Sequence, residues 1–581
     1  MLFRGIGAAP GLAVAQVLII RQAPESVTVM QPIKREQVEV EVNLFRQAVD
    51  VAAAQLGAIM ERARKAGDET KVEIIGAQRL MLTDPTIEDE VRDKIGTRFY
   101  SAIGAVSETV EEQAELLSGL EDPYLRERAA DVRDIGYRLT AILQGTPEQD
   151  LSTLAEEVIL VGREITTSQM ASIDATKVKG IVAEVGGKTS HTAILANNMG
   201  IPAVMGCAGV LDALRDGELL LVDGDKGLVE TSIDSNRRIM IESEMGRRKS
   251  LEENLWNLVD KPTRTRDGYA VYLEANIMDP AGAENAQQLG ADGIGLYRTE
   301  FLFMDRATAP TEDEQYEVYT KVLELMQGKP VIIRTLDIGG DKNIAYMNLP
   351  KEENPFLGYR AIRICLDDTE LFMTQLRAIL RAAAHGRARI MYPMIASLEE
   401  VRAANRILEA AKESLRTEGT AFDDSLQAGI MVEIPSAAVT ADLLIREAAF
   451  LSIGSNDLTQ YTLAVDRQNG KISSLFNPFQ PAVLRLIRTV IETANRAGGG
   501  KFAGMCGEMA SDPLATLLLL GLGLTEFSVN PSALLKIKNI ITSVDRSYAQ
   551  MVAAKVMQLS TADEIISCLK AAMPEDLQDH L

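Results

Sequence analysis

The chain has 581 residues, of which 46% are hydrophobic and 25% charged, and its formal net charge is −23. This length is too great for one hydrophobic core and predicts two to four domains. The acidic balance argues against a nucleic-acid binder, because no excess of Lys and Arg is present to displace counterions from phosphates.

Cysteine spacing and apolar runs indicate the compartment. The four cysteines are widely spread without a CxxC spacing, which disfavours a disulfide scaffold or a zinc site and predicts a reducing cytoplasm. The amino terminus is apolar, but glycines and a proline interrupt it between positions 5 and 11, which favours a strand pair over a signal peptide. The longest apolar run elsewhere, Leu514 to Leu524, is too short to span a bilayer. We therefore expect no membrane insertion.

From about Pro32 to Leu143 the apolar residues recur at helical spacing. Breaks at Asp84-Pro85 and Asp122-Pro123 divide this region. The sequence therefore predicts an all-helical module, either a docking surface for a partner or a bundle with merely solvated faces. Its expected helices cover residues 41–66, 70–82, 86–100, 102–120 and 123–143.

Strand patterns return after Gln149, at residues 158–161, 181–183, 203–205 and 219–222. Together with residues 1–22 they predict a small α/β domain into which the helical module is inserted. A charged helix follows between about Ser235 and Val259 and ends before Pro262, and we expect it to connect two domains.

One short stretch of this α/β domain has the pattern of an anion site. Gly186 and Gly187 end an apolar run, and the helical segment that follows places His191 in the first turn of a helix. Unpaired N–H groups and the positive end of the helix dipole attract an anion there, and an imidazole beside it can accept a phosphoryl group. The alternative is a histidine that only caps or packs. The chain has only three histidines, and hydroxyls and Lys188 adjoin this one. We therefore favour a functional role for His191 over a purely structural one.

The remainder of the chain alternates short apolar strands with helices, which predicts a (β/α)₈ barrel. The expected strands are residues 271–277, 293–299, 331–337, 389–394, 429–434, 450–455, 502–506 and 526–530. Active sites of such barrels lie at the C-terminal ends of the strands. Salt bridges at the rim are the alternative for any single polar residue there. The polar residues at these ends are Arg298, Arg334, Asp337, Glu433, Asn456, Asp457, Cys506 and Glu508.

The types of these side chains predict a phosphoester site. Glu433 and Asp457 offer hard oxygen ligands that suit Mg²⁺ better than zinc. Arg298, Arg334 and Arg467 offer planar forks for phosphate and carboxylate groups. We therefore expect a small substrate that carries both groups, together with a metal ion.

Cys506 adds a thiol at the same barrel mouth. Two interpretations are open, since a buried cysteine is usually an apolar packing residue, whereas its position at a barrel strand end favours catalysis.

Several stretches resemble enzyme I of the bacterial phosphoenolpyruvate:sugar phosphotransferase system. The segment GGKTSHT at 186–192 is similar to the phosphohistidine motif of that family. Motifs and domain order cover almost the full chain, and Ser455, where threonine is expected, keeps the hydroxyl. The barrel motifs of the family are similar to residues 295–303, 334–342, 354–360, 452–461 and 504–508.

The resemblance implies an α/β multidomain architecture. It implies a swivelling phosphohistidine domain with an inserted helical module, followed by the (β/α)₈ barrel. The implied boundaries are 1–22 plus 145–233 for the phosphohistidine domain, 23–144 for the module that binds the phosphocarrier, 234–262 for a helical linker, and 263–581 for the barrel, which also dimerises.

The resemblance also implies a reaction. Phosphoenolpyruvate and Mg²⁺ bind in the barrel, the phosphoryl group moves to His191 Nε2, and pyruvate is released. The histidine-containing phosphocarrier protein then accepts the group, which starts sugar uptake in the cytoplasm, and family members form homodimers. The implied roles are nucleophile for His191, metal ligand for Glu433 and Asp457, substrate binding for Arg298, Arg334, Asn456, Asp457 and Arg467, proton donor for Cys506, and a further phosphate contact for Arg360.

Other functions remain open. A pyruvate phosphate dikinase or phosphoenolpyruvate synthase would share the histidine domain and the barrel but needs an ATP-binding domain, and residues 1–150 contain no Gly-rich phosphate loop. A nitrogen-regulatory paralogue is expected to add a sensory domain at its amino terminus. A non-catalytic scaffold would lack some of the site residues, all of which are present.

Overall fold

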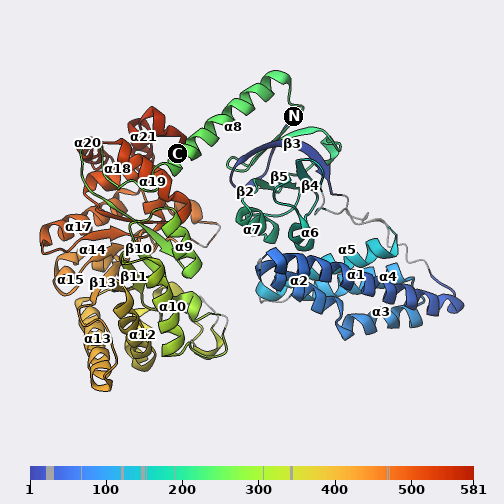
Figure 1. Cartoon of the computed structure of the whole chain (residues 1–581), viewed down its shortest axis with the longest axis horizontal. Coiled ribbons are helices and arrows are strands. Elements are labelled where there is room, and N and C mark those ends of the chain that lie inside the picture. Colours follow the sequence, from blue (N-terminus) through green and yellow to red (C-terminus); the bar gives the residue numbers. More distant parts are fainter. Residues whose placement is uncertain are drawn as a thin grey trace. The chain divides into compact units, whose positions relative to one another are not determined.

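The computed structural model of the chain describes residues 1–20, 32–66, 69–119, 123–145, 151, 154–188, 190–304, 306–339, 344–347, 349–467, 469 and 471–580. It divides into two compact units, Met1–Arg247 and Arg248–Leu581, which contain the elements labelled in Figure 1. The helix α8 (Ser235–Trp256) runs from the first unit into the second.

The first unit contains an eight-stranded sheet with the order β1-β8-β7-β3-β4-β5-β6-β2. Strands β3 to β6 run parallel, whereas β1, β2, β7 and β8 pair antiparallel with their neighbours. The strands are β1 (Leu2–Arg4), β2 (Ile6–Ala9), β3 (Leu12–Ile19), β4 (Val158–Gly162), β5 (Val178–Ala183), β6 (Ala203–Met205), β7 (Leu219–Asp223) and β8 (Leu228–Thr231).

The amino terminus forms three strands, so the predicted strand pair was wrong, and β8 was missed. The reason lies in the glycines that interrupt the apolar run. A Cβ on Gly5 would lie 2.5 Å from the carbonyl oxygen of Met205, and one on Gly7 would lie 2.2 Å from that of Gly224. Glycine is required at both positions because two backbones approach each other closely.

In the described residues between β3 and β4, five helices form the helical module. They are α1 (Val38–Ala66), α2 (Glu69–Leu82), α3 (Pro85–Thr97), α4 (Ala102–Ser118) and α5 (Pro123–Leu143). Asp84 and Ser101 cap α3 and α4 by accepting hydrogen bonds from Thr86 N and Gly104 N. Their apolar faces share one core that includes Phe45, Leu56, Ile75, Ile95 and Val106.

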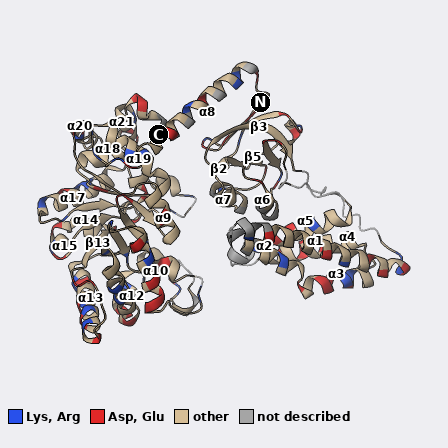
Figure 2. Ribbon diagram, in the orientation of Figure 1, with Lys and Arg blue, Asp and Glu red and all other residues tan. Residues whose placement is uncertain are grey.

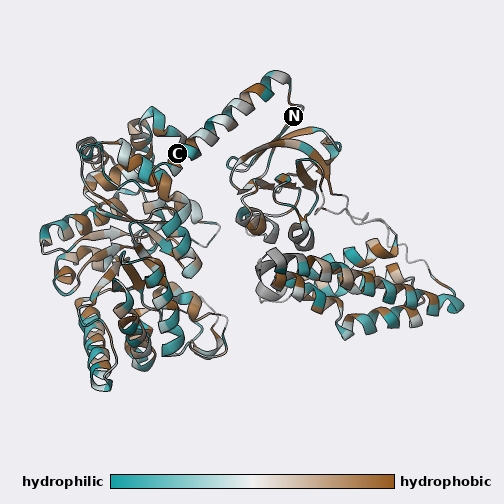
Figure 3. Ribbon diagram, in the orientation of Figure 1, coloured by the Kyte–Doolittle hydropathy of each residue, from teal (hydrophilic) through white to brown (hydrophobic). Residues whose placement is uncertain are grey.

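The second unit is the predicted barrel, with all eight strands parallel and the last strand paired with the first. Hydrophobic residues follow its strands, while the surrounding helices mix both characters, as Figure 3 shows. The charged residues in Figure 2 accordingly gather on helices such as α12 and α13. The strands are β9 (Tyr272–Ile277), β10 (Ile294–Arg298), β11 (Val331–Arg334), β12 (Ala388–Tyr392), β13 (Gln427–Val432), β14 (Leu451–Ile453), β15 (Ala503–Met505) and β16 (Glu526–Val529).

Thirteen helices accompany these strands in the described part of the second unit. No helix in the described part of the whole chain is both long and apolar enough to cross a membrane. The thirteen are α9 (Pro280–Gln288), α10 (Glu312–Leu325), α11 (Ile362–Asp367), α12 (Thr369–Ala382), α13 (Leu398–Glu418), α14 (Pro435–Val439), α15 (Ala441–Glu447), α16 (Ser455–Leu463), α17 (Pro481–Ala497), α18 (Pro513–Leu522), α19 (Pro531–Ser543), α20 (Arg546–Val556) and α21 (Ala562–Ala572).

The C-terminal end of α8 belongs to the barrel core. Leu255 is buried in that core, and Leu251, Leu258 and Val259 pack against it. The buried ammonium of Lys538 on α19 donates a 2.9 Å hydrogen bond to the carbonyl oxygen of Val259. The turn that follows α8 is thus fixed to the second unit.

An apolar layer in the barrel interior supports the mouth where the site residues lie. Leu296, Ile332, Met391 and Met431 form this layer with Phe450, and Cys506 is part of it. Successive interior residues of a strand are two positions apart, so the next interior positions are Arg298 on β10, Arg334 on β11 and Glu433 directly after β13.

Candidate active site

The predicted histidine lies at the first position of helix α7 (His191–Asn198), as the glycine pattern indicated. Gly186 has a φ of +116°, which a residue with a side chain rarely adopts. The Ser190 hydroxyl caps the helix, because it accepts a hydrogen bond from Ala193 N at 3.3 Å and donates one to the Gly187 carbonyl oxygen at 2.9 Å. The side chain of His191, together with Thr189, lies outside the described residues.

At the barrel mouth, Arg334 is the centre of a buried ionic network. Its Nη2 lies 2.8 Å from Glu300 Oε1 and its Nη1 lies 2.9 Å from Asp337 Oδ2. Burial disfavours the charge of this guanidinium, but Glu300 and Asp337 more than compensate and raise its pKa. Arg334 is therefore held as a permanent cation inside the barrel.

Asp337 joins a second arginine to this network. Its Oδ1 lies 2.9 Å from Arg360 Nη2. Arg360 Nε and Nη1, like Arg334 Nε, are buried and donate no hydrogen bond within the described part of the chain. These N–H groups are available to an anion at the mouth, and two guanidinium groups held by one carboxylate suit a phosphate.

The other predicted anion ligands come from neighbouring strand ends. Arg298 ends β10 and is half-buried, and Asn456 lies in the first turn of α16 directly after β14. Asn456 Nδ2 donates to Glu508 Oε1 at 3.1 Å, and its Oδ1 accepts from Glu508 N at 3.0 Å. Arg467 Nη1 lies 3.4 Å from Asp457 Oδ1. The structure thus brings all of these residues to one end of the barrel.

Glu433 and Asp457 form a carboxylate pair at the same mouth. Burial raises the pKa of Glu433 to about 8, and the negative charges of Asp457 and Asp337 add to the effect. Glu433 Oε1 accepts a hydrogen bond from Met394 N at 2.6 Å, whereas Asp457 Oδ1 is buried and accepts none from the described residues. Two buried carboxylates that repel each other are a site that a divalent cation stabilises.

The donor set at this pair fits a hard cation that keeps part of its ligands from water or substrate. No group of three or more His, Cys, Asp or Glu residues in the described part of the chain could hold a metal ion by itself. Mg²⁺ is commonly bound by one or two carboxylates plus waters and phosphate oxygens. The pair of Glu433 and Asp457 matches that arrangement.

Cys506 follows β15 and is buried at the edge of the mouth. Burial raises the pKa of its thiol to about 11, although a hydrogen bond from Ser452 and the charge of Arg334 lower it. The sulfur is therefore a protonated thiol at neutral pH, which can act as an acid. Asn276 Nδ2 donates to the Cys506 carbonyl oxygen at 3.1 Å and fixes this loop.

Several residues that support the site were not predicted. Glu300 immediately follows the Arg298-Thr299 strand end, so its place in the site could have been predicted from its position in the sequence. Gln375 on α12 gave no signal, yet its Oε1 accepts from Leu336 N at 2.9 Å and its Nε2 donates to Thr299 Oγ1 at 3.1 Å. It thereby joins the ends of β10 and β11. Gly340, Asp341 and Lys342 of the predicted motif lie outside the described residues.

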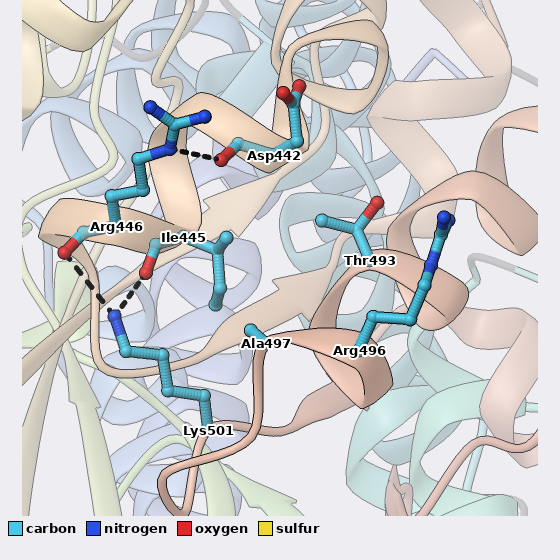
Figure 4. Close-up of a pocket in the computed structure, with 7 residues that line it drawn as sticks. All are labelled: Asp442, Ile445, Arg446, Thr493, Arg496, Ala497 and Lys501. Carbon is cyan, nitrogen blue, oxygen red and sulfur yellow. Dashed lines mark hydrogen bonds between the residues drawn. The ribbon is translucent and has the colours of Figure 1, made fainter.

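A separate cavity of about 380 Å³ is lined by side chains of α15 and α17 and by Lys501. Figure 4 shows that Lys501 Nζ donates to the carbonyl oxygens of Ile445 and Arg446, which lie in the last turn of α15. Lys501 precedes β15, so the cavity lies at the opposite strand ends from Cys506, and none of the predicted site residues lines it.

Comparison with known proteins gives matches along nearly the whole chain. Residues 252–546 match the phosphoenolpyruvate (PEP)-binding domain of the PEP-utilising enzymes. Residues 4–128 match the N-terminal domain of these enzymes, and residues 154–227 match their mobile domain. The chain is 42% identical over 569 residues to the phosphoenolpyruvate-protein phosphotransferase of Bacillus subtilis, covering 98% of this chain and 99% of that protein. It is 43% identical over 575 residues to the protein of the same name from Haemophilus influenzae, with 98% and 99% covered.

Proposed function

Because this chain belongs to the PEP-utilising enzymes and, within them, to the phosphoenolpyruvate-protein phosphotransferases, we propose that phosphoenolpyruvate binds at the barrel mouth and phosphorylates His191. The reaction transfers a phosphoryl group from phosphoenolpyruvate to protein and starts the phosphotransferase system. The observation that carries the site assignment is the buried network in which Asp337 holds Arg334 and Arg360, with spare N–H groups beside the Glu433–Asp457 pair.

The arginines bind and neutralise the substrate. Arg334 and Arg298 take the phosphate, with Arg360 as a further contact, while Arg467 and Asn456 orient the rest of the molecule. Phosphoryl transfer depends mainly on such positioning and charge neutralisation. Because the guanidinium groups are already held by Glu300 and Asp337, little reorganisation is needed when the substrate arrives.

The family requires a divalent cation, and we assign it as Mg²⁺ held by Glu433 and Asp457. When bound, it supplies positive charge for the phosphate oxygens. The role of Cys506 is to deliver a proton. As the phosphoryl group leaves, the enolate of pyruvate remains, and the Cys506 thiol protonates its carbon so that pyruvate is released.

We propose that phosphorylated His191 passes its phosphoryl group to the histidine-containing phosphocarrier protein, which docks on the helical module, residues 23–144. Residues 1–22 plus 145–233 carry His191 between the two partners, residues 234–262 connect the halves, and residues 263–581 bind phosphoenolpyruvate and pair two chains as a homodimer. We place the protein in the cytoplasm.

The proposal is tested by incubating the full chain with labelled phosphoenolpyruvate and Mg²⁺. One site should be labelled, and the label should be acid-labile and base-stable, as expected for a phosphoramidate. His191→Ala should take up no label, while the control His385→Ala, which removes a histidine from the outside of the barrel, should be labelled like wild type. Label on His191→Ala, or a requirement for ATP, would contradict the proposal.

A further inference from the structure

The Cys506 thiol lies on an apolar layer, and the hydroxyl of Ser452 lies beside it. Leu296, Ile332 and Met431 belong to the buried cluster that contains Cys506. Ser452 on β14 is equally buried, and its Oγ donates a hydrogen bond to Cys506 Sγ at 3.4 Å. Within the described part of the chain, no other side chain donates a hydrogen bond to the Cys506 sulfur.

The backbone fixes the two side chains in this arrangement. Strands β14 and β15 are paired in register, with Ser452 opposite Gly504 and Ile453 opposite Met505. Cys506 N donates to the Ile453 carbonyl oxygen at 3.1 Å, which continues the ladder to the cysteine. Cys506 Sγ lies 3.9 Å from the same carbonyl oxygen. The sulfur therefore sits between a hydroxyl donor and a carbonyl acceptor.

We propose that Ser452 is a positioning residue for the protonation step, and that its hydroxyl stabilises the thiolate which Cys506 becomes when it gives its proton to the enolate. This inference rests on the proposed function, because it requires Cys506 to be the proton donor. Ser452 itself exchanges no proton with the substrate.

Proton transfer from Cys506 to the enolate needs no reactant other than water. The S–H bond of Cys506 breaks and a C–H bond forms at the methylene carbon of the enolate, whose π electron pair makes the new bond while the carbonyl is restored. The electron pair of the S–H bond stays on sulfur, and water later returns a proton to it. A neutral thiol is a weak acceptor, whereas a thiolate makes a charge-assisted hydrogen bond, so the Ser452 contact strengthens as charge develops.

A buried thiolate without this donor is less stable, and proton transfer to the enolate is slower. Hydrogen bonds to charged groups are strong enough that their loss reduces a rate by roughly 10- to 100-fold. The KM for phosphoenolpyruvate should change little, because Ser452 lies beneath the arginines and touches the sulfur rather than the phosphate ligands.

The experiment compares Ser452→Ala, Ser452→Thr and Ser452→Val in the full chain. Threonine and valine have nearly the same shape and differ by the hydroxyl. Pyruvate formation is measured with Mg²⁺ and the phosphocarrier protein, together with KM, the solvent deuterium isotope effect and thermal stability. We expect kcat to fall roughly 10- to 100-fold in the alanine and valine variants, with a larger isotope effect, while the threonine variant stays close to wild type.

Two results would overturn the inference in distinguishable ways. If threonine and valine variants lose kcat equally, or if alanine and valine keep it, the hydroxyl has only a packing role, and the proposed function is untouched. Cys506→Ala is measured alongside them. If that variant keeps the wild-type rate of pyruvate formation, the thiol is not the acid, and the role of Cys506 fails together with that of Ser452. Phosphoryl exchange between His191 and the carrier should be normal in every variant.

Discussion

Arg467 Nη1 lies 3.4 Å from Asp457 Oδ1, so one of the carboxylates assigned to the cation also contacts an arginine assigned to the substrate. The charge of Asp457 in turn contributes to the raised pKa of Glu433. Cation, carboxylates and arginine therefore form one electrostatic unit. Removal of any member changes the charge felt by the others, so single substitutions are expected to act on cation and substrate together.

Glu433→Gln and Asp457→Asn should each abolish most labelling by phosphoenolpyruvate at limiting Mg²⁺, because each replaces a carboxyl group that can bind the cation as an anion by an amide that stays neutral. Labelling is measured over a Mg²⁺ titration, with thermal unfolding to show that the barrel is intact. Asp442→Asn, which changes an exposed acid on the outer helix α15, is the matched control and should behave like wild type. Wild-type labelling by either variant at limiting Mg²⁺ would remove that residue from the ligands.

Much of this site could be predicted because its parts are local in sequence. A strand followed by Arg298 or Arg334 is visible as a short apolar run with a charged end, and parallel strands bring such ends together. Gln375 and Ser452 could not be found in this way. Gln375 contacts Thr299 across 76 residues, and Ser452 contacts Cys506 across 54 residues, so both contacts exist only after the barrel closes. The close approaches that require Gly5 and Gly7 are equally non-local.

Cys506→Ala should lose most pyruvate formation while binding of phosphoenolpyruvate is kept. A general acid contributes about 10²–10⁴-fold, so a loss in this range is expected. The rate of pyruvate release is compared with the carrier-exchange rate in the same preparation, and exchange should be normal because it involves only His191. A loss well below tenfold would leave Cys506 as a packing residue and indicate water as the acid.

A fragment of residues 248–581 should be more stable than one of residues 262–581. The shorter fragment lacks Leu255, which is buried in the barrel core, and the Val259 carbonyl that accepts from Lys538. Loss of a buried leucine lowers the free energy of unfolding by about 1.5–3 kcal/mol. A buried ammonium without its acceptor lowers it by about 1–3 kcal/mol more.

The two fragments are compared by thermal unfolding, and Lys538→Met serves as the control. This substitution removes the buried ammonium, so it should narrow the difference between the fragments. The longer fragment should bind phosphoenolpyruvate without transferring its phosphoryl group, since His191 is absent. Equal melting temperatures would show that the end of α8 contributes nothing to the barrel.

Glu526→Gln should make the stability of the barrel less dependent on pH. Glu274 and Glu526 are both buried in the barrel interior, below the site, and Arg389 is near them. Burial raises the pKa of Glu526 from 4.5 to about 7, against the opposing charge of Arg389, and burial with the charge of Glu526 raises the pKa of Glu274.

The raised pKa of Glu526 determines how the stability of the barrel changes with pH. An acid whose pKa is higher in the folded than in the unfolded state binds its proton more tightly when folded, so it stabilises the fold at low pH. That contribution is fully present below about 4.5 and is lost as the pH rises through about 7. A glutamine is neutral at every pH, so the variant should unfold at a higher temperature than wild type above pH 7, and the difference should shrink as the pH falls toward 4.5. Melting temperatures of both proteins over this range test the prediction, with Glu284→Gln on the outer helix α9 as an exposed control. A constant difference between Glu526→Gln and wild type would contradict the raised pKa of Glu526.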